Sequence, residues 1–329
     1  MLRVAIVGGG NIGQVHATCY RAMPDVQLVG LAEQRLDLHA SLHERFGCPV
    51  FPSLEALLAH VRPDVLDICL PTPAHGPAIR TALAAGLRFI ICEKPLARTG
   101  AEARDLVARC AAAGAQLFVG QVVRFFPQYV ALREAIQRGD VGQPAIVRTS
   151  RGGPPPARDW YLDLTQSGGV IFDTLIHDFD WLHWTFGPVA RVYARHAGPR
   201  GLGQIDYALV TLRFRNGVIA HTEGLWARSR FGTSVEVAGD QGLLTYDSFR
   251  TQPLLLDRRD GQGPLPYTPA VDTPGGETPF YRELRHFLDC MRGGARPRIT
   301  PDEARYAVEI AEAALRSAQT GQPVALPEE

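Results

Sequence analysis

The sequence predicts a two-domain α/β protein whose N-terminal domain is a Rossmann-type, doubly wound parallel sheet. Two observations carry this prediction. Short apolar runs alternate with helical segments over residues 1–122, which is the pattern of βαβ units. A glycine-rich loop follows the first apolar run and opens the first helix. Because 329 residues exceed one ordinary hydrophobic core, we expect a second domain over 123–329.

The first domain is predicted to contain five strands with helices between them. The strands are expected at 4–7, 27–32, 65–70, 88–92 and 116–119. The helices are expected at 13–22, 53–61, 75–85 and 99–113. Gly86 and Gly114 follow the last two helices, where glycine is the usual terminating residue.

After residue 122 the pattern predicts helices mixed with mainly antiparallel strands. The helices are expected at 128–138, 170–186, 280–292 and 301–319. The strands are expected at 143–150, 189–197, 205–214, 218–225, 233–238 and 242–246. The segments 215–217 and 239–242 are typical of hairpin turns. Loops are expected over 151–156 and over 259–279, which are rich in Pro and Gly.

Composition excludes several classes of function. The chain has 34 basic and 34 acidic residues, so no net positive field favours nucleic acid or an anionic membrane. No apolar run approaches the ~18 residues of a membrane span. The first residues lead directly into the glycine loop, so no signal peptide is expected. The six cysteines show no metal-ligand spacing and indicate buried thiols in a reducing compartment. We therefore expect a cytoplasmic protein without a metal.

One residue stands out in the composition. Of the 34 cationic residues, 33 are arginine and only Lys94 is lysine. Lysine is a compact donor that can give up a proton on burial, whereas arginine effectively never does. Lys94 also follows the strand predicted at 88–92, and ligand sites in open α/β sheets lie at the carboxyl ends of strands. The sequence therefore predicts that Lys94 contacts the reacting oxygen of a substrate.

The glycine-rich loop predicts a dinucleotide site. It reads G-x-G-x-x-G, and its amide groups at the start of a helix can hold a pyrophosphate. Glu33 lies twenty residues beyond the last glycine, at the end of the second strand, where a carboxylate accepts the ribose hydroxyls. Arg35 is either a solvated surface charge, which we favour, or a partner for a 2′-phosphate. NAD is therefore expected, with NADP possible. The predicted contacts of the loop are Gly8, Gly10, Asn11, Ile12 and Gly13.

Beyond this motif, the sequence resembles the glucose–fructose oxidoreductase/inositol dehydrogenase (Gfo/Idh/MocA) family over nearly the whole chain. Three further segments carry the resemblance, namely 71–75 (PTPAH), 93–96 (EKPL) and 168–180 (GGVIFDTLIHDFD). The family implies a second domain with a large, mostly antiparallel open sheet, often used for contacts in a homodimer or homotetramer. It also implies that Lys94, Asp173 and His177 line the cleft at the nicotinamide. Thr72, Pro73, His75 and Glu93 would contact the cofactor.

The residues themselves suggest how such a site would work. Asp173 and His177 are four apart on the predicted helix 170–186 and so share one of its faces. His177 is expected to take the hydroxyl proton of a sugar, inositol or related polyol. Lys94 would stabilise the developing negative charge, and Asp173 would orient the pair. Arg124 and Trp160 are further candidates for substrate contacts, although both residue types are also common in loops that have no role in binding.

Two other functions use the same fold. One is an NAD-dependent glycoside hydrolase, in which the redox change is only transient. The other is a regulatory protein that binds NAD without catalysis. The presence of Lys94, Asp173 and His177 argues against the regulatory protein, while the hydrolase stays open, since function depends on the site and not on the fold.

Overall fold

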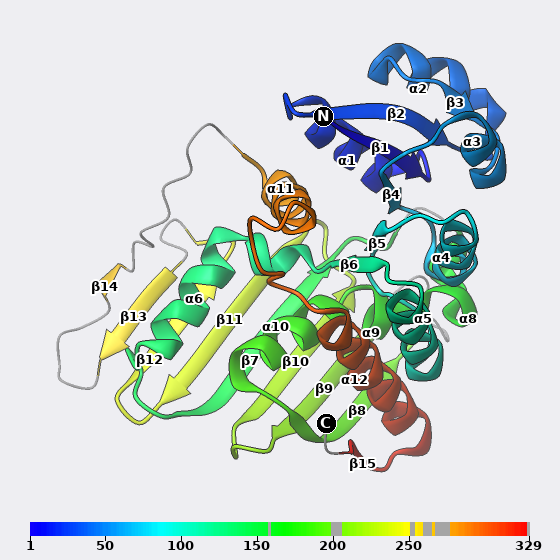
Figure 1. The fold of residues 1–329 in the computed structure, drawn as a ribbon. Helices are drawn as coiled ribbons and strands as arrows, with labels where there is room; N and C mark the ends of the chain where they lie inside the picture. The colour runs from blue at the N-terminus through cyan, green and yellow to red at the C-terminus, as the bar shows by residue number, and fades with distance from the viewer. Residues whose placement is uncertain (157–158, 199–205, 251–253, 259–264, 267–276, 328–329) are drawn as a thin grey trace. The chain divides into compact units, whose positions relative to one another are not determined.

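The chain folds into two compact units in the computed structural model (Figure 1). The structure describes residues 1–156, 159–198, 206–250, 254–258, 265–266 and 277–327. Unit 1 comprises Met1–Phe125 with Pro274–Arg305, and unit 2 comprises Phe126–Thr273 with Tyr306–Glu329. Residues 277–305, which the sequence analysis placed in the second domain, thus fold with the first part of the chain.

Unit 1 contains a six-stranded parallel sheet in the order β3-β2-β1-β4-β5-β6, which is the Rossmann order. Its strands are β1 (Leu2–Val7), β2 (Val26–Ala32), β3 (Val50–Phe51), β4 (Val65–Ile68), β5 (Phe89–Glu93) and β6 (Gln116–Gly120). The predicted fold class is confirmed. Strand β3 was missed because two residues give no periodicity from which a strand can be recognised.

Helices connect these strands. They are α1 (Asn11–Arg21), α2 (His39–Phe46), α3 (Leu54–His60), α4 (His75–Ala84) and α5 (Gly100–Ala112), with short 3₁₀ segments η1 (Leu36–Leu38), η2 (Thr72–Ala74) and η3 (Val122–Phe125). Ser53 and Thr99 cap α3 and α5 by accepting from backbone amides three residues ahead. The central strands are buried on both faces, which explains their largely apolar sequences, with Asp67 and Glu93 as the buried exceptions in β4 and β5.

Helix α11 (Pro279–Met291) belongs to unit 1 although it lies far along the chain. Its apolar face buries Phe287, whose ring centroid lies 5.2 Å from that of Phe118 on β6. On the opposite side Arg285 donates to Asp25, just before β2, at 2.8 Å. The sequence predicted this helix but could not tell which unit its apolar face covers.

Unit 2 is built on a nine-stranded sheet in the order β14-β13-β12-β11-β7-β10-β9-β8-β15 among the described residues. Its strands are β7 (Pro144–Gly153), β8 (Val189–Ala197), β9 (Asp206–Phe214), β10 (Ile219–Trp226), β11 (Gly232–Gly239), β12 (Gly242–Asp247), β13 (Leu254–Arg258), β14 (Leu265–Pro266) and β15 (Val324–Ala325). All neighbours are antiparallel except β7 and β10, which are parallel. The mostly antiparallel sheet is confirmed.

Several boundaries in unit 2 differ from the prediction. Strand β7 continues through Gly153, so the start of the predicted loop 151–156 is strand, because its backbone pairs with β10 and β11. Strands β13, β14 and β15 were not predicted. The loop expected over 259–279 lies largely outside the described residues.

Helices cover one face of the unit 2 sheet (Figure 1). They include α6 (Pro127–Gln137), α10 (Ile176–Phe186) and the part of α12 (Pro301–Thr320) that follows Arg305. Burial alternates along β9 and β10, with every second side chain buried beneath the helices. The other face carries half-exposed and exposed side chains. Two further short helices, α7 (Asp159–Leu162) and α8 (Leu164–Ser167), lie between β7 and α9 in the chain.

The single helix predicted over 170–186 is wrong, because the structure has two helices there. Helix α9 (Gly169–Asp173) ends before Thr174, and α10 begins at Ile176. At the break, the amide of Leu175 donates to the carbonyl of Val170, five residues back instead of four. The Thr174 hydroxyl accepts a hydrogen bond from the Trp226 indole at 2.8 Å. Asp173 and His177 therefore do not share the face of one continuous helix.

The predicted apolar face of this region is confirmed despite the break. Ile171, Leu175, Phe179 and Leu182 are fully buried, and Phe186 is 6% exposed. The extra backbone residue at the break rotates α10 relative to α9, and the apolar side chains on both helices still face the interior.

A buried ion pair joins α10 to the sheet. Arg151 on β7 donates from Nε to Asp178 Oδ2 at 2.5 Å and from a terminal nitrogen to the Tyr129 hydroxyl at 2.8 Å. Arg151 is 4% exposed and Asp178 is fully buried. Both charges have left water, so each depends on the other for compensation.

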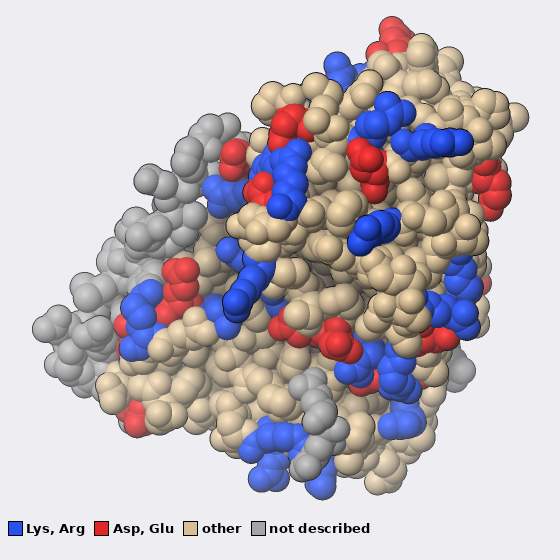
Figure 2. Space-filling model, in the orientation of Figure 1, with Lys and Arg blue, Asp and Glu red and all other residues tan. Residues whose placement is uncertain are grey.

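On the surface, acidic and basic groups are interspersed across the described residues that face the viewer in Figure 2. This mixing agrees with a net charge of zero. No helix within the described residues is long and apolar enough to cross a membrane.

We predict that Asp178→Asn destabilises the protein by about 3–5 kcal/mol, because Arg151 would remain buried without a charged partner. Arg250→Gln is the control, since it removes the exposed pair with Asp247, and such pairs contribute about 0–1 kcal/mol. Chemical denaturation followed by circular dichroism measures both. Equal effects of the two variants would contradict the prediction.

Candidate functional site

The glycine-rich loop lies between β1 and α1 in the geometry that a pyrophosphate requires. Gly8 follows β1, Gly10 is the N-cap of α1, and Asn11, Ile12 and Gly13 form its first turn. A Cβ atom on Gly13 would lie 1.9 Å from the carbonyl oxygen of Gly8, so only glycine allows this approach of helix and strand. The free amides at the start of α1 are thereby available to an anion.

Glu33 follows β2 and directs its carboxylate to this loop. One oxygen accepts from the Gly9 amide at 2.9 Å and the other from the Arg35 amide at 3.0 Å. Burial acts to raise the pKa of Glu33, but the hydrogen bonds from Arg35 and Gly9 outweigh it and lower the pKa overall. Glu33 is therefore an anion beside the loop. Arg35 is about half exposed and ion-paired with Glu33, so it is not simply a solvated charge.

The segment after β4 carries three predicted cofactor residues. Thr72 is buried and Pro73 is exposed, both in η2. The buried ring of His75 contacts the carbonyl oxygens of Leu70 at 2.8 Å and Pro95 at 2.9 Å. Burial lowers the pKa of His75 more than these contacts raise it, so the neutral ring donates to one carbonyl at a time. His75 thus joins this segment to the one that follows Lys94.

Lys94 directly follows β5 and is half-buried. Its backbone amide donates to Glu93 Oε2 at 3.1 Å. Glu93 is 7% exposed, and its other oxygen lies 3.3 Å from Nε2 of His16 on α1. The carboxyl end of β5 therefore carries the lysine, as expected, together with a buried histidine that was not expected.

His16 and Asp67 were missed by the sequence analysis. His16 Nδ1 lies 2.9 Å from Asp67 Oδ2, and both residues are fully buried. The sequence feature that could have indicated this pair is Asp67, a single carboxylate within the otherwise apolar strand β4. His16, Asp67 and Cys69 also form a group whose ligand atoms lie within 4.8 Å of one another. We interpret the group as hydrogen-bonded, because the Cys69 sulfur lies 3.4 Å from His16 Nδ1 and 3.5 Å from Asp67 Oδ1.

Asp173 and His177 lie in unit 2, at the end of α9 and in the first turn of α10, and both are half-buried. The start of α9 is fixed by Asp206, which accepts from the Val170 amide at 2.8 Å. Asp206 also contacts His196 Nε2 at 2.5 Å. The two predicted catalytic side chains are thus held on neighbouring short helices.

The two remaining substrate candidates have different surroundings. Arg124 is fully buried in unit 1, where it donates to Glu303 at 3.1 Å and to the carbonyl of Arg298 at 2.8 Å. These contacts hold the Arg124 side chain within unit 1. Trp160 is half-buried in α7, and its ring stacks on Tyr161 with centroids 3.8 Å apart.

Comparison with known proteins matches both parts of the chain. Residues 2–121 match the model described as an oxidoreductase family with an NAD-binding Rossmann fold, and residues 129–245 match the GFO/IDH/MocA C-terminal domain. Myo-inositol 2-dehydrogenase of Thermotoga maritima is 26% identical over 99% of both chains. Inositol 2-dehydrogenase of Rhizobium meliloti is 28% identical over 96% of both. GenD2 from gentamicin A biosynthesis, solved in complex with NAD, has a TM-score of 0.87 at 28% identity and covers 99% of this chain and 97% of its own.

The Rossmann sheet, its glycine loop and these matches define an NAD-dependent oxidoreductase. The two matched regions together span more than half of the chain. The chain belongs to the Gfo/Idh/MocA oxidoreductase family.

We predict that NAD binds at least about tenfold more tightly than NADP, because the Glu33 carboxylate repels a 2′-phosphate; that ratio corresponds to about 1.4 kcal/mol. Titration of protein fluorescence with each cofactor measures the two dissociation constants. Glu33→Gln should narrow the ratio, and Arg35→Gln is the matched control. Equal constants in the wild-type protein would show that Arg35 receives the phosphate.

Proposed function

We propose that this protein is a dehydrogenase that oxidises a hydroxyl group of a sugar, inositol or related polyol, with NAD as cofactor. The observation that carries the proposal is Lys94, the only lysine of the chain, located at the carboxyl end of β5 in the NAD-binding unit. Two of the relatives are named inositol 2-dehydrogenases, which supports this class of substrate.

The proposed reaction divides the work among three side chains. His177 accepts the proton of the substrate hydroxyl, and Lys94 donates a hydrogen bond to the same oxygen while negative charge develops there. Asp173 orients the pair and holds a neighbouring hydroxyl. NAD, when bound, supplies the acceptor for the carbon-bound hydride. The products are a carbonyl compound, NADH and the proton held by His177.

The residues at the glycine loop fit this cofactor. We propose Gly8, Gly10, Asn11, Ile12 and Gly13 for the pyrophosphate and Glu33 for the ribose hydroxyls, with Arg35 beside them. Thr72, Pro73, His75 and Glu93 complete the proposed cofactor set, with His75 and Glu93 acting by holding the backbone around Lys94. Trp160 is proposed as a substrate contact.

A panel of inositols, aldoses and polyols tests the substrate class. Formation of NADH is followed by absorbance with each compound, with NAD and with NADP. Turnover of at least one cyclic polyol or aldose supports the proposal. Release of a sugar from glycosides without net formation of NADH would instead identify the NAD-dependent hydrolase.

His177→Ala is expected to lower turnover by ~10²–10⁴, the usual loss for a general base, while binding of NAD stays nearly unchanged. Initial rates and a fluorescence titration with NAD measure the two effects. His183→Ala, on the same helix, is the control for helix integrity. Wild-type turnover in His177→Ala would remove His177 from the mechanism.

Lys94→Arg is expected to fold, to bind NAD and to lose most of its turnover. Arginine keeps the positive charge but has a larger, planar head group that effectively never deprotonates. The remaining 33 of the 34 Lys and Arg residues are all arginine, so the protein tolerates arginine well. Steady-state kinetics of Lys94→Arg beside Lys94→Ala measure the effect. If only the alanine variant is impaired, Lys94 serves only as a charge.

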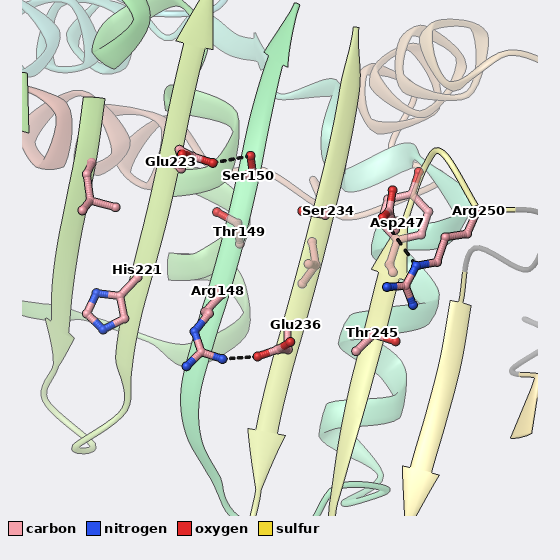
Figure 3. A pocket seen from close by; sticks show the side chains of 13 residues that line it. Arg148, Thr149, Ser150, His221, Glu223, Ser234, Glu236, Thr245, Asp247 and Arg250 are labelled. Carbon is pink, nitrogen blue, oxygen red and sulfur yellow. Dashed lines mark hydrogen bonds and ion pairs between the residues drawn. The ribbon is translucent and has the colours of Figure 1, made fainter. Parts of the chain in front are cut away.

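We further propose that the protein forms a homodimer or homotetramer through the open face of the unit 2 sheet. Leu209 and Ile219 are 42% and 38% exposed there, beside the Arg148–Glu236 ion pair. The same face holds a shallow depression of about 410 Å³ (Figure 3). A monomeric mass by light scattering would refute this proposal.

We also propose that the protein is located in the cytoplasm. The six free cysteines agree with a reducing compartment, and cell fractionation tests the location.

A further inference from the structure

The feature with no role so far is the buried ring of His16. It lies on α1, one turn beyond the glycine loop, and no part of it is exposed. Its two nitrogens lie 2.9 Å from Asp67 on β4 and 3.3 Å from Glu93 on β5. Strands β4 and β5 are neighbours in the sheet, so one ring bridges two strands from the helix above them.

The surroundings of His16 favour its protonated form. Burial by itself would lower the pKa of His16, but the neighbouring Cys69 and Asp67 raise it by more, and the pKa lies well above its ordinary value. The contact with Asp67 is a direct one, since Nδ1 of His16 lies 2.9 Å from a carboxylate oxygen of Asp67. A protonated ring attracts both carboxylates: Nδ1 is hydrogen-bonded to Asp67, whereas Nε2 lies at ion-pair distance from Glu93 without the alignment of a hydrogen bond.

Asp67 is fixed independently of His16. The Tyr20 hydroxyl, one helical turn beyond His16 on α1, donates to the same carboxylate at 2.8 Å. Burial raises the pKa of Tyr20, so this hydroxyl remains a donor. The ring of Phe280 on α11 lies 6.0 Å from that of His16. The Asp67 carboxylate that His16 contacts is therefore held in place by a second hydrogen bond.

On the other side, Glu93 connects His16 to Lys94. Glu93 has one carboxylate oxygen at the His16 ring, and the other accepts from the Lys94 backbone amide at 3.1 Å. Gly120 is paired with Glu93 across β5 and β6, and a Cβ atom there would lie 3.1 Å from the oxygen facing His16. The carboxylate thus occupies a space that a side chain at Gly120 would narrow.

We propose that His16 is a positioning residue that holds the Glu93 carboxylate in the orientation required by the backbone of Lys94. The helix that presents amides to the pyrophosphate is thereby connected to the residue that acts on the substrate hydroxyl. The inference rests on the role of Lys94 in the proposed function, and its test separates the two.

Two substitutions of His16 each remove one of the two contacts of the ring and keep the other. The amide nitrogen of asparagine can take the place of Nδ1, so His16→Asn keeps a donor to Asp67 and loses the ion-pair contact with Glu93. The amide nitrogen of glutamine can take the place of Nε2, so His16→Gln keeps the donor to Glu93. Tyr20→Phe is the matched control, because it removes a hydrogen bond to Asp67 and leaves the His16–Glu93 contact in place.

The position of Lys94 can be measured without a substrate. Because the chain has a single lysine, protein labelled with ¹³Cε-lysine gives one Lys94 resonance. We expect His16→Asn to shift or broaden this resonance, and His16→Gln and Tyr20→Phe to leave it close to the wild-type position. Thermal unfolding by circular dichroism establishes that each variant is folded.

The kinetic test uses NAD with the fastest substrate of the polyol panel. We expect His16→Asn to lower kcat at least about tenfold, or about 1.4 kcal/mol in activation free energy, with little change in the KM of the polyol. His16→Gln should retain most of kcat, and Tyr20→Phe should lose stability without losing kcat. A purely structural role would instead lower kcat in all three variants in proportion to lost stability, which overturns the inference.

Two further outcomes are decisive. A wild-type Lys94 resonance and wild-type kcat in His16→Asn, with Lys94→Arg inactive, would overturn the role of His16 and leave the proposed function intact. An active Lys94→Arg would overturn the proposed function, and the resonance would then decide the role of His16 alone. Stoichiometric zinc in the purified protein, lost in His16→Asn, would show a metal site and overturn the inference.

Discussion

The close approach of helix α1 to the carboxyl edge of the parallel sheet is the constraint on which unit 1 depends. The approach is possible because Gly13 has no side chain to meet the Gly8 carbonyl. It leaves the first amides of α1 free for an anion, and it also brings the next turn of α1 down onto β4 and β5. The side chain at position 16 faces the sheet and is fully buried, and a buried charge must be compensated. Asp67 and Glu93 supply the compensation for His16.

Unit 2 also contains a buried ion pair next to a residue of the proposed site. Arg151 on β7 and Asp178 on α10 meet beneath the helix, and Asp178 is the neighbour of His177 in the sequence. In unit 1, Glu93 is the neighbour of Lys94 in the same way. Desolvation offsets much of the attraction in such pairs, so they add little net stability compared with apolar packing. Breaking one is nevertheless strongly destabilising, which restricts the adjacent backbone to the arrangement in which both partners meet.

Function in this fold is carried by the site, since the same scaffold supports unrelated activities. The identification as an NAD-dependent oxidoreductase follows from the Rossmann order, the glycine loop and the family match. The choice of polyol depends on side chains around the substrate, of which the sequence indicates Asp173, His177 and Trp160. The break between α9 and α10 places Asp173 and His177 on two separate helices.

The sequence by itself determined the parallel sheet of unit 1, the glycine loop, the position of Lys94 at a strand end and the apolar face of α9 and α10. These features depend on local periodicity, turn chemistry and strand order, all of which are encoded within short segments. Only the tertiary structure decided that α11 packs in unit 1, that β7 pairs parallel to β10, that the helix over 170–186 breaks at Thr174, and that His16 bridges Asp67 and Glu93. Each of these depends on partners distant in the sequence, and local pattern carries no information about which distant partner a side chain will meet.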